Sequence, residues 1–363
     1  MKEKLRSRIR ELTSLIGISG CEWDVSRYIY GVLDGHVDSL ELLPNGALIA
    51  VKRGGRPGVR RVLSAHMDEV GYSVRTIDAR GFLHFDKVGG ATEACMPGRR
   101  VLVKGRGEAI PGVIGVRSAH VASPQELAKA QTVDESYVDI GVSSREEALA
   151  LGIGTGAQIV PDSPCAELHD PDIMTSRAID CRVLCAIIIE TMLRLGREDF
   201  AGEICAVFSV MEETTIMGVM PAINKLLPTY GLFLDTIPTN DVPGGDTETG
   251  IPLRIGGGPA VLVSQQLARG FRRAVAHPKL LAALEELAAR DGIPYQAFAY
   301  DCGSMMTDAS AAAHSGYGTA TATLGVPRRY SHSPVELINL NDAVGAQRLT
   351  EAFIRENLDI SML

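Results

Sequence analysis

The chain has 363 residues, 45% of them hydrophobic, so it can bury a large core and is longer than one typical domain. Its formal net charge of -8 at pH 7 argues against a broad basic surface, and therefore against nucleic acid or an anionic membrane as a partner. No stretch approaches the roughly 18 uninterrupted apolar residues that a membrane span needs. We therefore expect a soluble protein.

The amino terminus predicts a helix over residues 3–16, because Leu5, Ile9, Leu12 and Ile16 recur at helical spacing among charged residues. A secretory signal peptide would instead contain a continuous apolar block. This pattern favours a cytoplasmic protein.

The cysteines point to the same compartment. There are seven, an odd number, without CxxC spacing, which argues against a disulfide framework and against a structural zinc knot. Cys181 and Cys185 stand one helical turn apart and could share a metal, although cysteines on apolar helices more often simply pack. The cysteines lie at positions 21, 95, 165, 181, 185, 205 and 302.

The order of the expected elements predicts two parts. Helical and strand-like segments alternate up to about residue 71 and again from about 165, as in an α/β domain. Between them, residues 72–164 consist of short β-like runs separated by glycines and prolines, which predicts an inserted β domain. The α/β segments are helices at 3–16, 23–34, 181–195, 218–227 and 277–292, strand-like runs at 41–53, 60–68, 202–210, 230–235, 294–301 and 319–327, a segment at 306–316 that could be helical, and a surface loop at 243–252.

Acidic and histidine residues follow three of the apolar strands. His66 and Asp68 follow one, Glu212 and Glu213 follow the next, and Asp235 follows a third. Ligands of open α/β sheets bind outside the carboxyl ends of the strands, so we expect these side chains to converge on one crevice. Several carboxylates held that close would repel one another unless a cation lay between them.

The expected cation is a divalent metal. Histidine and carboxylate ligands without thiolates suit zinc, cobalt or manganese better than calcium or an iron–sulfur cluster. Zinc is the first expectation and cobalt the second.

Each residue also has an ordinary structural interpretation. A single HxD motif such as that of His66 is usually structural, and two glutamates after a strand usually complement a helix dipole. Asp180, directly before an apolar helix, is typical of an N-cap. The combination of these features, and not any one of them, favours a metal site.

Five motifs occur in the order seen in one known family. They are AHMDEVG (65–71), SRAID (176–180), MEE (211–213), FLDT (233–236) and PRRYSHSPVE (327–336). In these motifs the chain resembles the tetrahedral, TET-type aminopeptidases, which include glutamyl and deblocking aminopeptidases. GVIG (112–115), YVDIGVSSREEALALGI (137–153) and GGGPAV (256–261) also resemble family segments. The resemblance therefore covers nearly the whole chain, including the inserted β domain.

The resemblance implies a set of metal ligands. His66 would bind one ion together with Asp235, and His332 would bind a second ion together with Glu213. Asp180 would bridge the two ions. It thus implies two divalent ions per subunit, with zinc first and cobalt or manganese as alternatives.

Two further residues receive roles from the resemblance. Glu212 would be the general base, and Asp68 would orient His66. The implied reaction is removal of the amino-terminal residue from short peptides. The implied fold is a twisted mixed α/β sheet flanked by helices, formed by residues 1–71 and 165–363, with a small β-barrel or PDZ-like domain inserted at 72–164. The insertion would mediate dimers that assemble into a tetrahedral homododecamer.

The sequence departs from the family pattern at two places. The family usually has two consecutive aspartates where this chain has Asp180 and Cys181, and it usually has glycines where this chain has Met305 and Met306. The first change concerns metal binding, and the second concerns the shape of the substrate pocket.

Other functions and sites remain open at this stage. A glycoside hydrolase would use a carboxylate pair without metals, and a non-catalytic metal-binding assembly protein would retain only part of the site. The glycines at 256–258 lack the order of a phosphate-binding loop, so they predict a backbone turn. His120 in the β insertion would either reach a catalytic site or lie on the surface.

Overall fold

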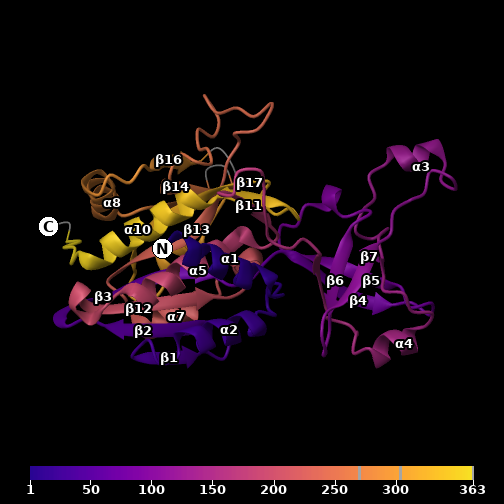
Figure 1. The fold of residues 1–363 in the computed structure, drawn as a ribbon, viewed down its shortest axis with the longest axis horizontal. Coiled ribbons are helices and arrows are strands. Elements are labelled where there is room, and N and C mark those ends of the chain that lie inside the picture. Colours follow the sequence, from indigo (N-terminus) through magenta and orange to yellow (C-terminus); the bar gives the residue numbers. More distant parts are fainter. Residues whose placement is uncertain (269–270, 302–304, 362–363) are drawn as a thin grey trace.

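The computed structural model describes residues 1–268, 271–301 and 305–361. Figure 1 shows two parts: an α/β part, and a β-barrel that projects from it on the right. Of the cysteines considered above, Cys302 lies outside the described residues.

The α/β part is built on one mixed sheet, with twelve strands among the described residues. Its four central strands are parallel: β12 (Ala201–Ser209), β3 (Arg56–His66), β13 (Tyr230–Pro238) and β17 (Ala320–Arg329). Three of them are almost entirely buried, and β3 is buried over its second half, residues 61–66. Continuous apolar runs of this kind are typical of parallel strands covered on both faces. The other strands are β1 (Ser39–Leu42), β2 (Leu48–Arg53), β10 (Ala166–Glu167), β11 (Ile173–Ser176), β14 (Ala260–Ala268), β15 (Phe271–Val275), β16 (Gln296–Tyr300) and β18 (Glu336–Asn339).

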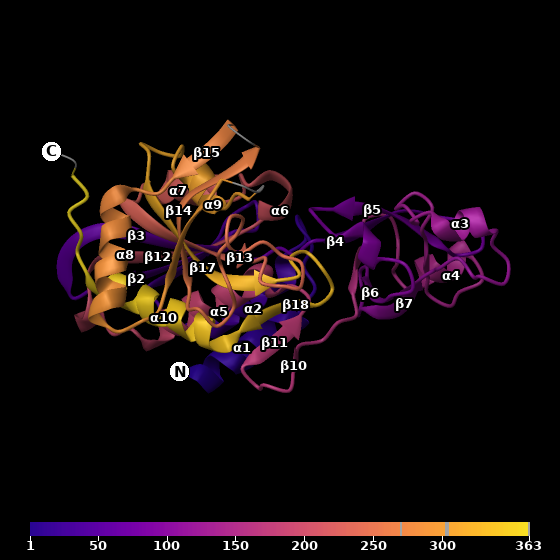
Figure 2. The same cartoon turned by 90° about the horizontal axis from the view of Figure 1, so that it is seen from above.

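Helices cover both faces of this sheet, as Figure 2 shows. The central helix α5 (Ile179–Arg194) packs against β3 and β13, and α1 (Lys2–Ser14) and α10 (Leu340–Arg355) contact it in turn. Residues 179–192 of α5 are all buried, and most of them are apolar, as expected for a helix covered on every side. The other helices of this part are α2 (Trp23–Leu33), α6 (Glu212–Thr215), α7 (Met220–Leu226), α8 (Pro278–Arg290), α9 (Asp308–Ala312) and the 3-10 turn Arg197–Asp199.

The inserted part is a closed barrel with its own core. Its strands are hydrogen-bonded in the order β4-β5-β8-β7-β6-β9, and the rings of Tyr72 and Phe85 meet edge to face inside it at 5.0 Å. The sequence-based fold class, a mixed α/β sheet with an inserted small β-barrel, is confirmed. The elements are β4 (Gly71–Ile77), β5 (Leu83–Val88), β6 (Arg100–Lys104), β7 (Ile110–Ile114), β8 (Val138–Asp139), β9 (Gln158–Pro161), α3 (Pro124–Ala128), α4 (Arg145–Ala150) and the 3-10 turn Glu93–Cys95.

Two segments differ from the sequence-based expectation. Residues 41–53 form a hairpin between β1 and β2 and not one extended run, because Asn45 accepts a hydrogen bond from the N–H of Ala47 and Gly46 adopts a φ of 96°. The segment 306–316 contains only the short helix α9, which Thr307 caps through its hydroxyl.

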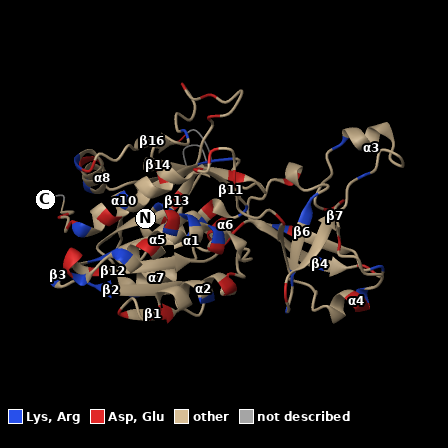
Figure 3. Ribbon diagram, in the orientation of Figure 1, with Lys and Arg blue, Asp and Glu red and all other residues tan. Residues whose placement is uncertain are grey.

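The charges are mixed over the whole fold. In Figure 3 acidic and basic residues are interspersed on both the α/β part and the barrel. Across the described ranges, no helix combines the length and apolar character required to cross a bilayer.

Candidate active site

The predicted residues meet at the carboxyl ends of the central strands. Strand β3 ends at His66, which pairs with Ser209 at the end of β12, and Asp235 lies near the end of β13. Helix α6 begins at Glu212, three residues beyond β12. His66, Glu212 and Asp235 line a cleft of about 360 Å³, together with Asp180 from the start of α5. The convergence that the strand ends suggested is therefore present in the fold.

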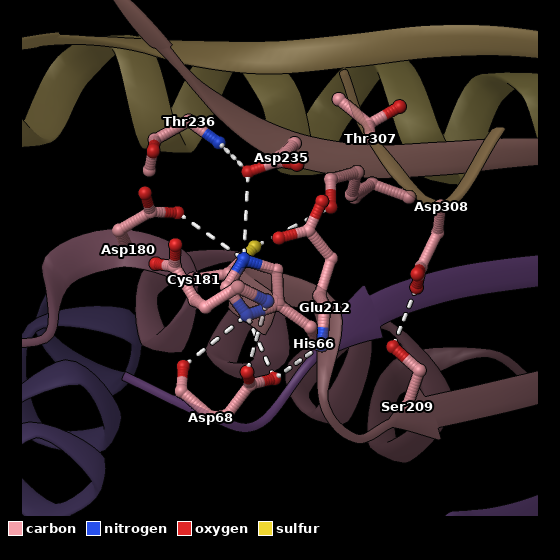
Figure 4. A network of polar contacts seen from close by, with 12 residues as sticks. His66, Asp68, Asp180, Cys181, Ser209, Glu212, Asp235, Thr236, Thr307 and Asp308 are labelled. Carbon is pink, nitrogen blue, oxygen red and sulfur yellow. Dashed lines mark hydrogen bonds and ion pairs between the residues drawn. The ribbon is translucent and has the colours of Figure 1, made fainter. Parts of the chain in front are cut away.

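The inner half of the site surrounds His66 (Figure 4). Its Nε2 lies 3.3 Å from Oδ1 of Asp180 and 3.8 Å from Oδ1 of Asp235. Its Nδ1 lies 3.3 Å from Oδ1 of Asp68. A neutral His66 that donates its Nδ1–H to Asp68 leaves the Nε2 lone pair directed at the two other carboxylates, which is how metal-binding histidines are usually oriented.

The outer half of the site surrounds His332. Its Nε2 lies 3.3 Å from Oδ2 of Asp180 and 3.2 Å from Oε2 of Glu213. The carboxylate of Asp180 thus has one histidine against each oxygen. No other predicted ligand is shared in this way between the two halves of the described site.

Asp180 is not the N-cap that its position suggested. The residue at the N-cap of α5 is Ala178, and no side chain caps this end. The backbone of Asp180 is non-helical, with φ -76° and ψ 114°, and its peptide bond to Cys181 is cis. Its N–H donates to Oε2 of Glu336 at 3.0 Å. The side chain is therefore directed into the cleft and does not cap the helix.

The donor atoms fit divalent metal ions. Among the described residues they form two groups, and within each group the ligand atoms lie within 4.8 Å of one another. Oδ1 of Asp180 and Oε1 of Glu213 are buried without a hydrogen-bond partner, and buried polar atoms of this kind call for an unseen water or ion. The groups are His66, Asp180, Cys181 and Asp235, and Asp180, Glu213 and His332.

The electrostatics of the site also fit a missing cation. Burial raises the pKa of Asp235 to about 7. Burial would lower the pKa of His332, but the charge of Glu213 and the hydrogen bond to Asp180 outweigh it and raise that pKa to about 11. Without an ion, protons must compensate for the excess of acidic groups, and divalent charge would replace those protons.

Asp68 connects the inner half of the site to the glutamate pair. Besides facing His66, its carboxylate accepts hydrogen bonds from the N–H groups of Glu212, at 3.1 Å, and Glu213, at 3.0 Å. It therefore caps the N-terminus of α6 and holds the backbone of both glutamates in position. Burial raises the pKa of Glu212 well above its ordinary value, and the carboxyl group lines the cleft.

Comparison with known proteins identifies the family. Residues 46–349 match the family model of the M42 glutamyl aminopeptidases. The chain belongs to the M42 aminopeptidase family. It is therefore a hydrolase that acts on peptide bonds, in a family of metallopeptidases that use divalent ions.

Individual M42-like proteins support this assignment over their full length. An aminopeptidase from the archaeon Desulfurococcus kamchatkensis is 33% identical, with a TM-score of 0.90 over 98% of this chain and 95% of that one. The lysyl aminopeptidase of Pyrococcus furiosus is 29% identical over 94% of each chain. The TET1 peptidase of Pyrococcus horikoshii, which can assemble into a tetrahedron or a large octahedral shell, is 27% identical, with a TM-score of 0.84 over 96% of this chain and 99% of that one.

Two residues of this M42 site had no role in the sequence-based prediction. Arg328 is 2% exposed, lies 2.7 Å from Oδ2 of Asp180 through Nη1, and also pairs with Glu336. Glu336 accepts hydrogen bonds from the N–H groups of Asp180 and His332. Both belong to the PRRYSHSPVE motif. Their charges, on either side of the candidate ligand His332, were the feature of the sequence that could have indicated a role in the site.

Met305 and Met306, the second departure from the family pattern, line the same cleft. With Ile216, Pro238 and Leu267 they form the apolar part of the lining, which we call the apolar wall. Both methionines therefore help to shape the space beside the candidate metal ligands.

The remaining candidates lie outside the site of this M42 chain. The N–H groups of Gly256 and Gly258 both donate to the carboxylate of Asp342, at 2.6 and 2.8 Å, so the glycine segment is a turn bound to the protein's own anion, as predicted. Cys185 donates to the backbone oxygen of His66 at 3.1 Å and belongs to neither ligand group, so it does not share a described site with Cys181. His120 is exposed on the barrel.

Proposed function

We propose that this chain is a dinuclear-metal aminopeptidase that removes the amino-terminal residue from short peptides. The observation that carries the proposal is the position of Asp180, whose carboxylate belongs to both groups of candidate ligands. One ion would be held by His66 and Asp235, the other by Glu213 and His332, and Asp180 would bridge them. Nitrogen and oxygen donors of this kind suit zinc first, with cobalt or manganese as alternatives.

The metal ions, Glu212 and Asp68 would have different roles in the proposed reaction. When bound, two divalent ions supply Lewis acidity, which polarises a peptide carbonyl and acidifies water. Glu212, which lines the cleft, would accept a proton from the attacking water and deliver it to the leaving amine. Asp68 keeps His66 and the start of α6 in position, so it acts on the reaction through its neighbours.

The cleft favours the end of a chain as substrate. Its volume, about 360 Å³, lies in the range of sites for small ligands, so we expect it to take the amino-terminal end of a short peptide. The apolar wall that includes Met306 would contact the first side chain of the substrate.

The barrel gives a basis for self-association. By analogy with the TET1 peptidase of Pyrococcus horikoshii, we propose that the inserted domain, residues 72–164, mediates dimers of the catalytic domain (1–71 and 165–363) that build a cytoplasmic tetrahedral homododecamer. Native mass spectrometry tests this assembly, since a strictly monomeric protein at working concentration would contradict it.

The activity is tested with a panel of aminoacyl-nitroanilides and short peptides. We expect hydrolysis from the amino terminus that is lost on chelation and restored by zinc, cobalt or manganese. Activity on glycosides that survives the chelator would instead support the carboxylate-pair glycosidase, a reading that family membership disfavours. Stoichiometric metal binding without any peptide hydrolysis would support the non-catalytic alternative.

A further inference from the structure

The thiol of Cys181 lies inside the inner half of the site. Cys181 is fully buried, and its Sγ belongs to the same ligand group as His66, Asp180 and Asp235. Figure 4 shows the sulfur beside the imidazole of His66, whose ring nitrogen also faces Asp180 and Asp235. The thiol also donates a hydrogen bond to the backbone oxygen of Leu234, with Sγ 3.4 Å from that oxygen.

Local backbone geometry separates Cys181 from the next cysteine on the helix. At Cys181 the backbone is still non-helical, with φ -110° and ψ 26°, so the regular turns of α5 begin beyond it. Cys185 lies within those turns and directs its thiol to the backbone oxygen of His66 at 3.1 Å. Both cysteines are buried, but of the cysteines that the structure describes, only Cys181 belongs to a group of candidate ligands.

We propose that the thiolate of Cys181 is a ligand of the inner ion, the one held by His66 and Asp235. The proposal rests on the dinuclear site proposed above. It assigns a function to the position at which this chain departs from the Asp-Asp pattern of the family it resembles. Binding breaks the S–H bond and forms a sulfur–metal bond, the proton leaves to solvent, and no electron is transferred.

A sulfur ligand would make the two halves of the site chemically different. The outer group, formed by Asp180, Glu213 and His332, offers only oxygen and nitrogen. The inner group adds one soft donor, and soft donors favour zinc and cobalt over manganese and magnesium. The inner half of this enzyme should therefore select thiophilic ions more strongly than the outer half.

Cobalt(II) is the probe that tests this ligand directly. We would strip the full-length protein with a chelator and titrate it with cobalt while recording its absorption spectrum. Coordination by sulfur gives a near-ultraviolet thiolate-to-cobalt charge-transfer band, whereas oxygen and nitrogen ligands give only ligand-field bands in the visible. The proposal predicts that the near-ultraviolet band saturates with one equivalent of cobalt per chain.

Three variants complete the test. In C181S and in C181D the near-ultraviolet band should be lost while the visible bands remain, and in the matched control C185S both should remain. C181D introduces the aspartate that is usual in the family at this position, so this variant can replace C181S in the test if C181S folds poorly.

The outcomes separate this inference from the proposed function. Visible bands without a near-ultraviolet band in the wild-type protein, or a near-ultraviolet band that persists in both Cys181 variants, would overturn the cysteine ligand and leave the dinuclear centre standing. If mass spectrometry shows that the protein binds neither cobalt nor zinc, the centre itself is wrong and both proposals fall.

Discussion

The two halves of the site share Asp180 but differ in their surroundings. The inner half is closed: His66 is 2% exposed, Asp235 is 7% exposed and Cys181 is fully buried. The outer half is open, because the side chain of His332 is 29% exposed. The inner ligands stand on or directly beside the central strands and α5, whereas His332 follows β17 in a loop and has a φ of 56°.

This difference in burial predicts that the two halves bind metal ions with different affinity and exchange them at different rates. Ligands at the ends of β3 and β13 cannot move without disturbing the core, so the inner half should bind its ion more tightly and exchange it more slowly. The outer half, reached from the cleft, should lose its ion first. The first and third predictions below change metal binding in both halves or in the inner half alone, and the second and fourth leave both halves loaded and change the chemistry or the substrate preference.

The largest effect is expected from removing the shared ligand. Asp180→Ala should abolish binding in both halves, lower metal content toward zero and reduce kcat at least as far as the loss of the general base does. Metal content per chain by inductively coupled plasma mass spectrometry checks the first effect. As a matched control, Asp241→Ala breaks an ion pair with Arg329 outside both ligand groups and should keep both ions. Retention of two ions by D180A would refute the shared position.

Loss of the candidate base should separate binding from chemistry. Glu212→Gln should lower kcat by about 10²–10⁴-fold while both halves keep their ions, because Glu212 belongs to neither ligand group. Steady-state kinetics beside metal analysis measures both effects, and the exposed Glu248→Gln is the control. Near wild-type turnover in E212Q would contradict the assigned role.

Asp68→Asn should weaken the inner half selectively. It removes the carboxylate that faces Nδ1 of His66 and one of two acceptors for the N–H groups that begin α6. Metal affinity of the inner half should fall by about 10- to 100-fold. Competition with a chromophoric chelator measures it, with Asp291→Asn, a half-buried partner of Arg290 far from both ligand groups in the sequence, as the control. Unchanged affinity would show that Asp68 serves only the α6 turn.

The smallest effect is expected at the apolar wall. Met306→Ala should leave both halves loaded and change the ratio of kcat/KM for large and small first side chains by about tenfold. The aminoacyl-nitroanilide panel measures this ratio. If all substrates change equally, Met306 does not contact the first side chain.

The sequence predicted the inner half better than the outer half. His66 and Asp235, the two inner ligands, and Glu213 of the outer half follow from their places after apolar strands, because strand ends in a parallel sheet share one edge. Asp180 and His332 could be predicted as ligands only from the family resemblance. An aspartate directly before a helix is normally interpreted as an N-cap, and a histidine in a loop belongs to no helical or strand pattern that would indicate its role. The four central strands and α5 were predictable from their apolar runs.

Other features depend on tertiary contacts that no local pattern contains. The buried pair of Arg328 and Glu336 exists because β17 and β18 bring both residues against Asp180. The spacing of Cys181 and Cys185 suggested a shared helix face, but the non-helical backbone at residue 181 separates their directions. Only the folded chain shows which of the two thiols faces the metal ligands.

The most direct test of the shared site is anomalous scattering from crystals of the zinc-loaded protein. We predict two zinc peaks per chain in the wild type, one beside His66 and Asp235 and the other beside Glu213 and His332, with the carboxylate of Asp180 between them. In crystals of His332→Ala the outer peak should disappear and the inner peak should remain. A single peak in the wild type, or two undiminished peaks in H332A, would contradict a centre built on Asp180.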